Sequence, residues 1–165
     1  MSENGGNGKP KILVIGSESE FLEKAKESLD DASYDVSMTS SEEEGLEKAR
    51  QENPDVIVLG YLEPRGTSFQ LHRELREDLL TKTVPLLIVD VRPEEHSRKG
   101  WKRHEGLHMN ADDYIAKPVE GDELIKVVEG ILRRASGEPM GLKEASEYME
   151  KALERINKIE ELLVR

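Results

Sequence analysis

The segment His104–His108 has the most direct chemical meaning of any stretch in this sequence. It reads HEGLH, a pattern in which two histidines one helical turn apart can bind Zn²⁺ while the glutamate acts as a general base. Gly106 weakens a helix in the middle of the motif, and no later histidine offers a third ligand. We therefore expect no bound metal or other cofactor, and we keep a zinc hydrolase only as a remote alternative.

Five short apolar runs are typical of buried strands, and segments with helical spacing separate them. The runs cover residues 11–15, 34–38, 56–59, 85–91 and 114–116. Ser17 with Glu20, and Ser41 with Glu44, form capping boxes that predict the starts of the first two helices.

The later helices are predicted from the spacing of apolar residues between Phe69 and Leu79 and between Leu124 and Leu132. Continuous apolar strands that alternate with helices predict a parallel sheet covered on both faces. We expect an α/β fold, a flavodoxin-like, doubly wound, five-stranded parallel sheet followed by a C-terminal α-helix. In such a sheet the carboxyl ends of the strands meet at one edge, where chemistry is usually located.

Composition limits the classes of function. The chain has 165 residues and a net charge of −11, which disfavours general binding to nucleic acid or to an anionic membrane. It has no cysteine, and no apolar stretch approaches the length of a membrane span. We therefore expect a cytoplasmic protein.

Residues 11–134 resemble the receiver domain of bacterial two-component response regulators. The motifs that carry the resemblance are, in order, KILVIGSESE, PDVIVLGYLEP, VPLLIVDV and ADDYIAKPVEGDEL, and the DYxxKP pattern is the most specific of them. The resemblance implies the parts of a phosphorylation site. An acidic pair would bind Mg²⁺, an aspartate would accept the phosphoryl group, and a lysine and a hydroxyl would hold its oxygens.

In this chain the resemblance implies a degenerate phosphorylation pocket. The positions that correspond to the family's site are Gly16, Ser17, Glu18, Gly60, Asp90 and Lys117. Gly60 replaces the acceptor aspartate and offers no nucleophile, and Asp90 places a negative charge where the phosphoryl group would sit. Lys117 and the switch aromatic, Tyr114, are kept. The resemblance therefore implies a pseudo-receiver.

Asp90 and Lys117 lie at the ends of strands that are neighbours in the receiver fold. We predict that they form a salt bridge, because Lys117 would otherwise lose its usual aspartate partner. Removing one member of a buried pair costs about 3–5 kcal/mol. We also expect this pair to fix Tyr114 in one rotamer.

One basic segment stands out in the acidic chain, between Arg92 and Asn110. It surrounds the single tryptophan, and its candidate partner-binding residues are Trp101, Arg98, Lys99, Lys102 and Arg103. One interpretation is a solvated loop with the tryptophan packed inward. The other is a docking surface for an acidic protein, because Trp and Arg are frequent in interface hot spots.

The chain ends in a second kind of pattern. A Gly- and Pro-containing linker at 135–141 precedes an amphipathic heptad helix at 142–165, and residues 1–10 have the composition of a disordered tail. The apolar residues of the helix are spaced alternately by three and four: Leu142, Ala145, Met149, Ala152, Ile156, Ile159 and Leu163. This seam predicts either a homodimeric coiled coil or a helix that folds back onto its own domain.

From these features we expect a signalling adaptor that is not an enzyme. It would be a phosphorylation-independent pseudo-receiver that binds protein partners in a two-component-type pathway. An alternative is a receiver that still responds to a ligand or a modification at its degenerate pocket.

Overall fold

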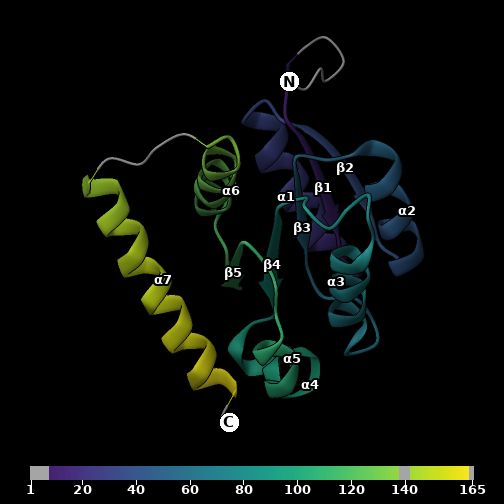
Figure 1. The fold of residues 1–165 in the computed structure, drawn as a ribbon. Coiled ribbons are helices and arrows are strands. Elements are labelled where there is room, and N and C mark those ends of the chain that lie inside the picture. Colours follow the sequence, from purple (N-terminus) through teal and green to yellow (C-terminus); the bar gives the residue numbers. More distant parts are fainter. Residues whose placement is uncertain (1–7, 138–141, 164–165) are drawn as a thin grey trace.

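The computed structural model describes residues 8–137 and 142–163, and it has the predicted α/β architecture (Figure 1). Five strands form one parallel sheet in the order β2-β1-β3-β4-β5. They are β1 Lys11–Ile15, β2 Asp35–Thr39, β3 Val56–Leu59, β4 Leu86–Asp90 and β5 Asp113–Ala116. This is the strand order of a flavodoxin-like doubly wound sheet, so the predicted fold class is confirmed.

Helices cover both faces of the sheet. They are α1 Ser19–Asp31, α2 Glu42–Glu52, α3 Thr67–Glu77, α4 His96–Lys99, α5 Arg103–Leu107, α6 Gly121–Ala135 and α7 Leu142–Leu163, with a 3₁₀ helix at Pro93–Glu95. Helices α1 and α6 pack on one face, while α2, α3 and the segment that carries α4 and α5 pack on the other (Figure 1).

The strands separate two apolar cores because their side chains alternate between the faces. Val14 and Val58 belong to the core under α1 and α6. Leu13 and Leu59, their neighbours in sequence, belong to the core under α2 and α3. The strands are therefore buried on both sides, which explains their continuous apolar sequences and holds their carboxyl ends in fixed positions.

The two predicted capping boxes have different outcomes. Ser41 caps α2, since its hydroxyl accepts a hydrogen bond from the Glu44 amide at 3.1 Å. The reciprocal half of the predicted box is not formed, because the Glu44 carboxylate accepts the Thr39 hydroxyl. The box at Ser17 is wrong, because α1 begins at Ser19 with Glu18 as the N-cap residue and without a side-chain cap. The Ser17 hydroxyl instead accepts from the Glu63 amide at 2.9 Å and so connects the loops that follow β1 and β3.

The third helix ends earlier than predicted. Leu79 was expected to continue its apolar face, but α3 stops at Glu77 and Leu79 is 81% exposed. Asp78 explains the stop, because its carboxylate accepts the Leu80 amide at 2.8 Å and pairs with Arg50 across the helices. These local bonds turn the chain toward β4.

Parts of the predicted domain organisation lie outside the described residues. These parts are 1–7 of the predicted tail, 138–141 of the predicted linker, and the last two residues of the chain. Helix α6 extends to Ala135, the first residue of the predicted linker. Within the described ranges, no helix is both long and apolar enough to cross a membrane.

Candidate functional site

Four strand ends meet at the carboxyl edge of the sheet, where the sequence predicts the pocket. The Gly60 amide donates to the last carbonyl of β1 at 2.7 Å, and the Ser17 amide donates to the Tyr61 carbonyl at 2.7 Å. Further along the same edge, the Lys117 amide after β5 donates to the Asp90 carbonyl at the end of β4 at 3.0 Å. These backbone bonds bring the predicted pocket residues together on rigid elements.

Phe21, in the first turn of α1, occupies the space beside the two glycines of this edge. A Cβ atom added to Gly60 would lie 2.7 Å from Cε2 of the Phe21 ring, and one added to Gly16 would lie 3.2 Å from Cδ2. The first distance is shorter than real Cβ contacts, so a side chain at position 60 and the ring in its present position exclude each other. The missing side chain at Gly60 therefore makes room for an aromatic ring.

Lys117 extends over this ring to a carboxylate of the neighbouring loop. Its Nζ lies 4.8 Å from the Phe21 ring centroid and 2.5 Å from Oε1 of Glu18. The other oxygen of Glu18 lies 3.4 Å from Nζ of Lys99, which also pairs with Glu95 at 3.8 Å. Glu18 thus contacts two ammonium groups, one from α4 and one from the residue that follows β5.

The charges around Glu18 decide its protonation state. Burial alone would raise the pKa of its carboxyl, but the hydrogen bonds and positive charges of Lys117 and Lys99 outweigh burial and lower this pKa below its usual value. The carboxylate is therefore ionised at neutral pH. The stability that its pairing contributes is lost only when the pH falls through this lowered pKa.

The predicted salt bridge between Asp90 and Lys117 is wrong. Asp90 is 3% exposed, and its Oδ2 accepts the Tyr114 hydroxyl at 2.7 Å and, more weakly, the Trp101 amide at 3.4 Å. Its Oδ1 accepts the Val91 amide at 2.8 Å. The physical reason is that Glu18 offers Lys117 a closer, half-exposed carboxylate, while Asp90 finds neutral donors on the inner side of β4 and β5.

Tyr114 is buried, and its hydroxyl is bound to the carboxylate of Asp90. Burial, and then the negative charge and hydrogen bond of Asp90, raise the pKa of the Tyr114 phenol far above its usual value. The phenol therefore remains protonated and acts as the donor. The contact that holds Tyr114 in its inward position is therefore its own bond to Asp90, and Lys117 takes no part in it.

Known proteins are similar to this chain in sequence and in fold. Residues 12–129 match the family described as the response regulator receiver domain. The chain belongs to this family.

Among relatives, the transcriptional regulatory protein PhoP of Bacillus subtilis, named for alkaline phosphatase synthesis, is 34% identical over 125 residues, which cover 76% of this chain and 49% of PhoP. This chain therefore spans about half the length of that relative. Protein PilH of Pseudomonas aeruginosa is 30% identical over 122 residues, covering 74% of this chain and 97% of PilH.

Solved receiver structures have the same fold. A CheY-like receiver domain protein from Methanospirillum hungatei has a TM-score of 0.66 and 22% identity, over 80% of this chain and 100% of the other. The chemotaxis response regulator CheY4 of Vibrio cholerae has a TM-score of 0.62 and 24% identity, over 74% and 98% of the two chains. At these identities the likeness shows the fold alone.

The fold is that of the family, but the pocket is filled differently from the phosphorylation site that the resemblance implies. The resemblance predicts a phosphorylation site at these strand ends, with Gly60 at the acceptor position and Gly16 and Ser17 at the positions of the acidic pair. In the structure the space beside the two glycines holds Phe21. The lysine contacts a carboxylate of the β1–α1 loop.

The basic segment of this receiver folds over an aromatic cluster. Trp101 is 6% exposed, and its ring makes edge contacts with Phe69 at 5.7 Å and His72 at 5.3 Å between centroids. This favours the interpretation in which the tryptophan packs inward, so Trp101 is not part of an exposed docking surface. Among the other candidates, Lys99 is half-buried at the Glu18 carboxylate.

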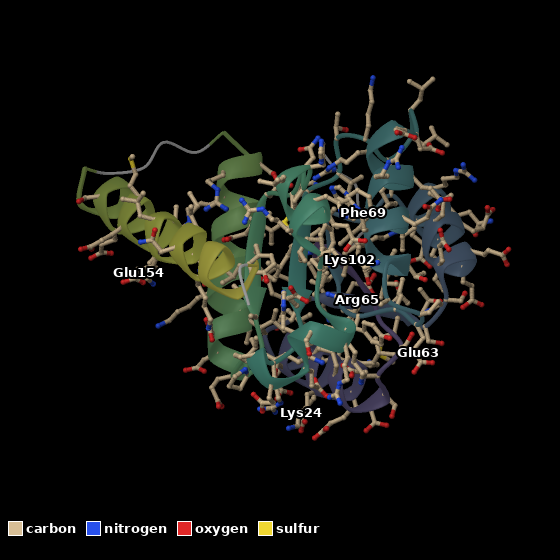
Figure 2. The ribbon with its side chains drawn as sticks, turned by 90° about the horizontal axis from the view of Figure 1, so that it is seen from below. Lys24, Glu63, Arg65, Phe69, Lys102 and Glu154 are labelled. Carbon is tan, nitrogen blue, oxygen red and sulfur yellow. The ribbon has the colours of Figure 1, made fainter. Side chains whose placement is uncertain are left out.

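The remaining basic candidates face solvent. Arg98, Lys102 and Arg103 are exposed, and Figure 2 shows Lys102 near Arg65 on the side of the molecule that carries α4 and α5. Arg65 holds this segment in place, because its guanidinium donates to the carbonyls of Ser97 and Gly100 at 2.8 Å each. The loop after β3 is thereby fixed to the segment after β4.

The HEGLH motif has a structural role in this fold. Glu105 is buried, and its Oε1 accepts the Lys102 amide at 2.7 Å, which caps the start of α5. His104 and His108 are exposed, and His108 Nδ1 lies 2.9 Å from the His104 carbonyl. No group of three or more His, Cys, Asp or Glu side chains within residues 8–137 and 142–163 is arranged to hold a metal ion. Glu105 thus serves as a helix cap.

Sequence reasoning missed two residues of this site. Neither Phe21 nor Arg65 is among the residues that the sequence predicts for the site. The pair of glycines at the ends of adjacent strands, followed by an aromatic residue one turn into the next helix, is the signal that could have indicated Phe21. No local pattern marks Arg65, because its partners are about 30 residues further along the chain.

The contact between Phe21 and Gly60 can be tested by a double-mutant cycle. We expect Gly60→Ala to lower the free energy of unfolding by about 1 kcal/mol, because the new methyl group overpacks the ring. In a Phe21→Ala background the same substitution should cost clearly less, since the ring is gone. Urea denaturation of the four proteins measures the coupling. Equal costs in both backgrounds would show that the ring does not fill this space.

The bond between Tyr114 and Asp90 makes a separate prediction. Tyr114→Phe leaves a buried carboxylate without its strongest donor, so we expect a loss of about 1.5–3 kcal/mol in the free energy of unfolding. Tyr61→Phe is the matched control, because it removes the same oxygen from a half-exposed ring and should have little effect. If the two variants unfold alike, Asp90 does not depend on the phenol.

Proposed function

We propose that this receiver acts without phosphorylation, as a protein-binding adaptor in a two-component-type signalling pathway, and that it is not an enzyme. The observation that carries the proposal is the packing of Phe21 against Gly60. Phosphoryl transfer to a receiver needs a carboxylate at the end of β3 to attack the donor. A glycine has no nucleophile, and the ring takes the space that the transferred group would need.

The charges of the pocket support the same proposal. A receiver lysine serves phosphorylation when its ammonium is available to phosphoryl oxygens. Here Lys117 is engaged with Glu18 at 2.5 Å, and Glu18 is also held by Lys99. Asp90 would repel a phosphoryl group, and its oxygens already accept hydrogen bonds from the chain itself. The pocket therefore has its charges balanced without an incoming anion.

The fixed position of Tyr114 suggests how such a receiver would signal. A switch changes state only if a ligand binds one of its states better than the other. In this chain Asp90, a residue of the protein itself, holds the phenol inward. We therefore expect one permanent conformation of the face formed by β4, β5 and the α4–α5 segment, which partners would bind regardless of a phosphoryl donor.

The partner that we infer is a protein with an acidic surface. Arg98, Lys102 and Arg103 lie exposed on the α4–α5 segment, whereas the whole chain carries a charge of −11. Most of the molecule would repel an acidic protein, so this basic surface is where such a partner would bind. The same net charge disfavours nucleic acid as the partner.

Acetyl phosphate provides the test of phosphorylation. We expect the intact mass of the protein to stay unchanged after incubation with acetyl phosphate and Mg²⁺, because position 60 has no acceptor. A phosphorylatable receiver treated in parallel serves as the positive control. A gain of one phosphoryl group in this chain would refute the proposal.

The basic surface can be tested by charge reversal. We expect the double variant Arg98→Glu/Arg103→Glu to lose partner recovery in pull-downs from lysate of the native host, because it removes the attraction to an acidic surface. Lys24→Glu/Lys82→Glu changes the net charge equally at exposed positions elsewhere and is the control (Figure 2 labels Lys24).

The loss should affect an acidic protein whose recovery from the parent also falls as salt is raised. Equal recovery by the two double variants would contradict a role for this surface.

A further inference from the structure

We propose that the outward face of α7 binds the same face of a second copy of this chain. The outward face consists of Met149, Ala152, Leu153 and Ile156. Three of these side chains are large and apolar, and they are 63%, 60% and 52% exposed at Met149, Leu153 and Ile156. This inference is independent of the proposed absence of phosphorylation.

The orientation of α7 is unusual for a helix that lies beside its own domain. An amphipathic helix normally turns its apolar stripe to the core and its charged side to water. In α7 the charged side faces the domain instead. It lines a cavity of about 510 Å³ opposite β5 and α6, with the residues Glu147, Lys151, Glu154, Arg155 and Lys158. Burial of apolar surface within the chain therefore does not explain the position of this helix.

An ion pair connects this charged side to the sheet. Nη1 of Arg155 lies 2.6 Å from both carboxylate oxygens of Asp113, and both side chains are largely shielded from solvent. Asp113 is the first residue of β5, and its Oδ1 also accepts the Tyr114 amide at 2.9 Å. Helix α7 runs beside β5 and α6 in Figure 1 and also contacts α5. This anchor turns the outward face away from the domain.

The spacing of the outward face identifies a second helix of the same kind as its partner. Met149, Ala152 and Ile156 follow the three-and-four spacing of a heptad seam, and in the sequence this spacing runs through the whole of α7. From Leu142 to Ile156 large and small residues alternate along the seam, which suits knobs-into-holes packing. A two-fold pair of such helices is self-complementary, because each copy offers the same residues to the other.

The charges beside the seam also fit a second copy. Two molecules that each carry a charge of −11 repel each other unless their contact has few carboxylates. The positions that flank the seam in the sequence of α7 are Ser146, Tyr148, Leu153, Arg155, Glu160 and Leu162, and Glu160 is the one acidic residue among them. Glu147 and Glu154 lie on the side of the helix that lines the cavity. Self-association therefore meets little local repulsion.

The length of the helix limits the strength of the pair. The 22 residues of α7 span about 33 Å, which holds three heptads. A seam of this length gives a weak dimer, so the association should depend on protein concentration.

Sedimentation equilibrium of the full chain tests this inference. We expect the mean mass to rise with concentration from the 18.7 kDa of the single chain towards twice that value. Ile156→Glu should abolish the rise, because it places a charge in the centre of the seam. Asn157→Glu is the matched control, since it adds the same charge at the next, exposed position and should leave the association intact. Circular dichroism establishes that both variants keep the parent's helix content.

Three results would overturn the inference. The parent could remain at the mass of a single chain at every concentration, which would assign the outward face to another partner. Ile156→Glu could associate as the parent does, or Asn157→Glu could lose association as fully as Ile156→Glu. The intact mass after treatment with acetyl phosphate does not depend on any of these results, so the two proposals can fail separately.

Discussion

The packing of one aromatic ring against two backbone positions without side chains determines the arrangement of the sheet's carboxyl edge. Because Phe21 lies against Gly60 and Gly16, the centre of the pocket is apolar. Lys117 crosses the ring and finds its carboxylate at Glu18, in the loop where α1 begins. The two glycines, the ring and the ion pair thus form one unit, in which a change of any member alters the fit of the others.

The charged groups around this unit are satisfied by the chain itself. Glu18 lies between two lysines, and Asp90 accepts a phenol and two backbone amides. The charges at this edge of the sheet are therefore balanced within the chain, and two other features face outward. They are the basic surface on the α4–α5 segment and the apolar face of α7, which suits a protein that works by contact with other proteins.

The fold could be predicted from the sequence because its signals are local and repeated. Short apolar runs between helical patterns predict the number of strands, and parallel pairing brings their ends together. The side-chain contacts of the site could not be predicted, because neighbouring strand ends do not determine where long side chains point. Lys117 pairs with Glu18 and not with Asp90, and Ser17 accepts a hydrogen bond from Glu63 instead of capping α1. Both contacts join residues that are far apart in the sequence, so no local pattern predicts them.

A crystal structure of the protein grown with Mg²⁺ and acetyl phosphate tests the central claim most directly. We predict that the Phe21 ring lies in van der Waals contact with Gly60 and that the ammonium of Lys117 remains on the carboxylate of Glu18, as in the absence of the donor. A ring displaced from Gly60, with a metal ion or a phosphoryl group between Glu18 and Lys117, would contradict the account.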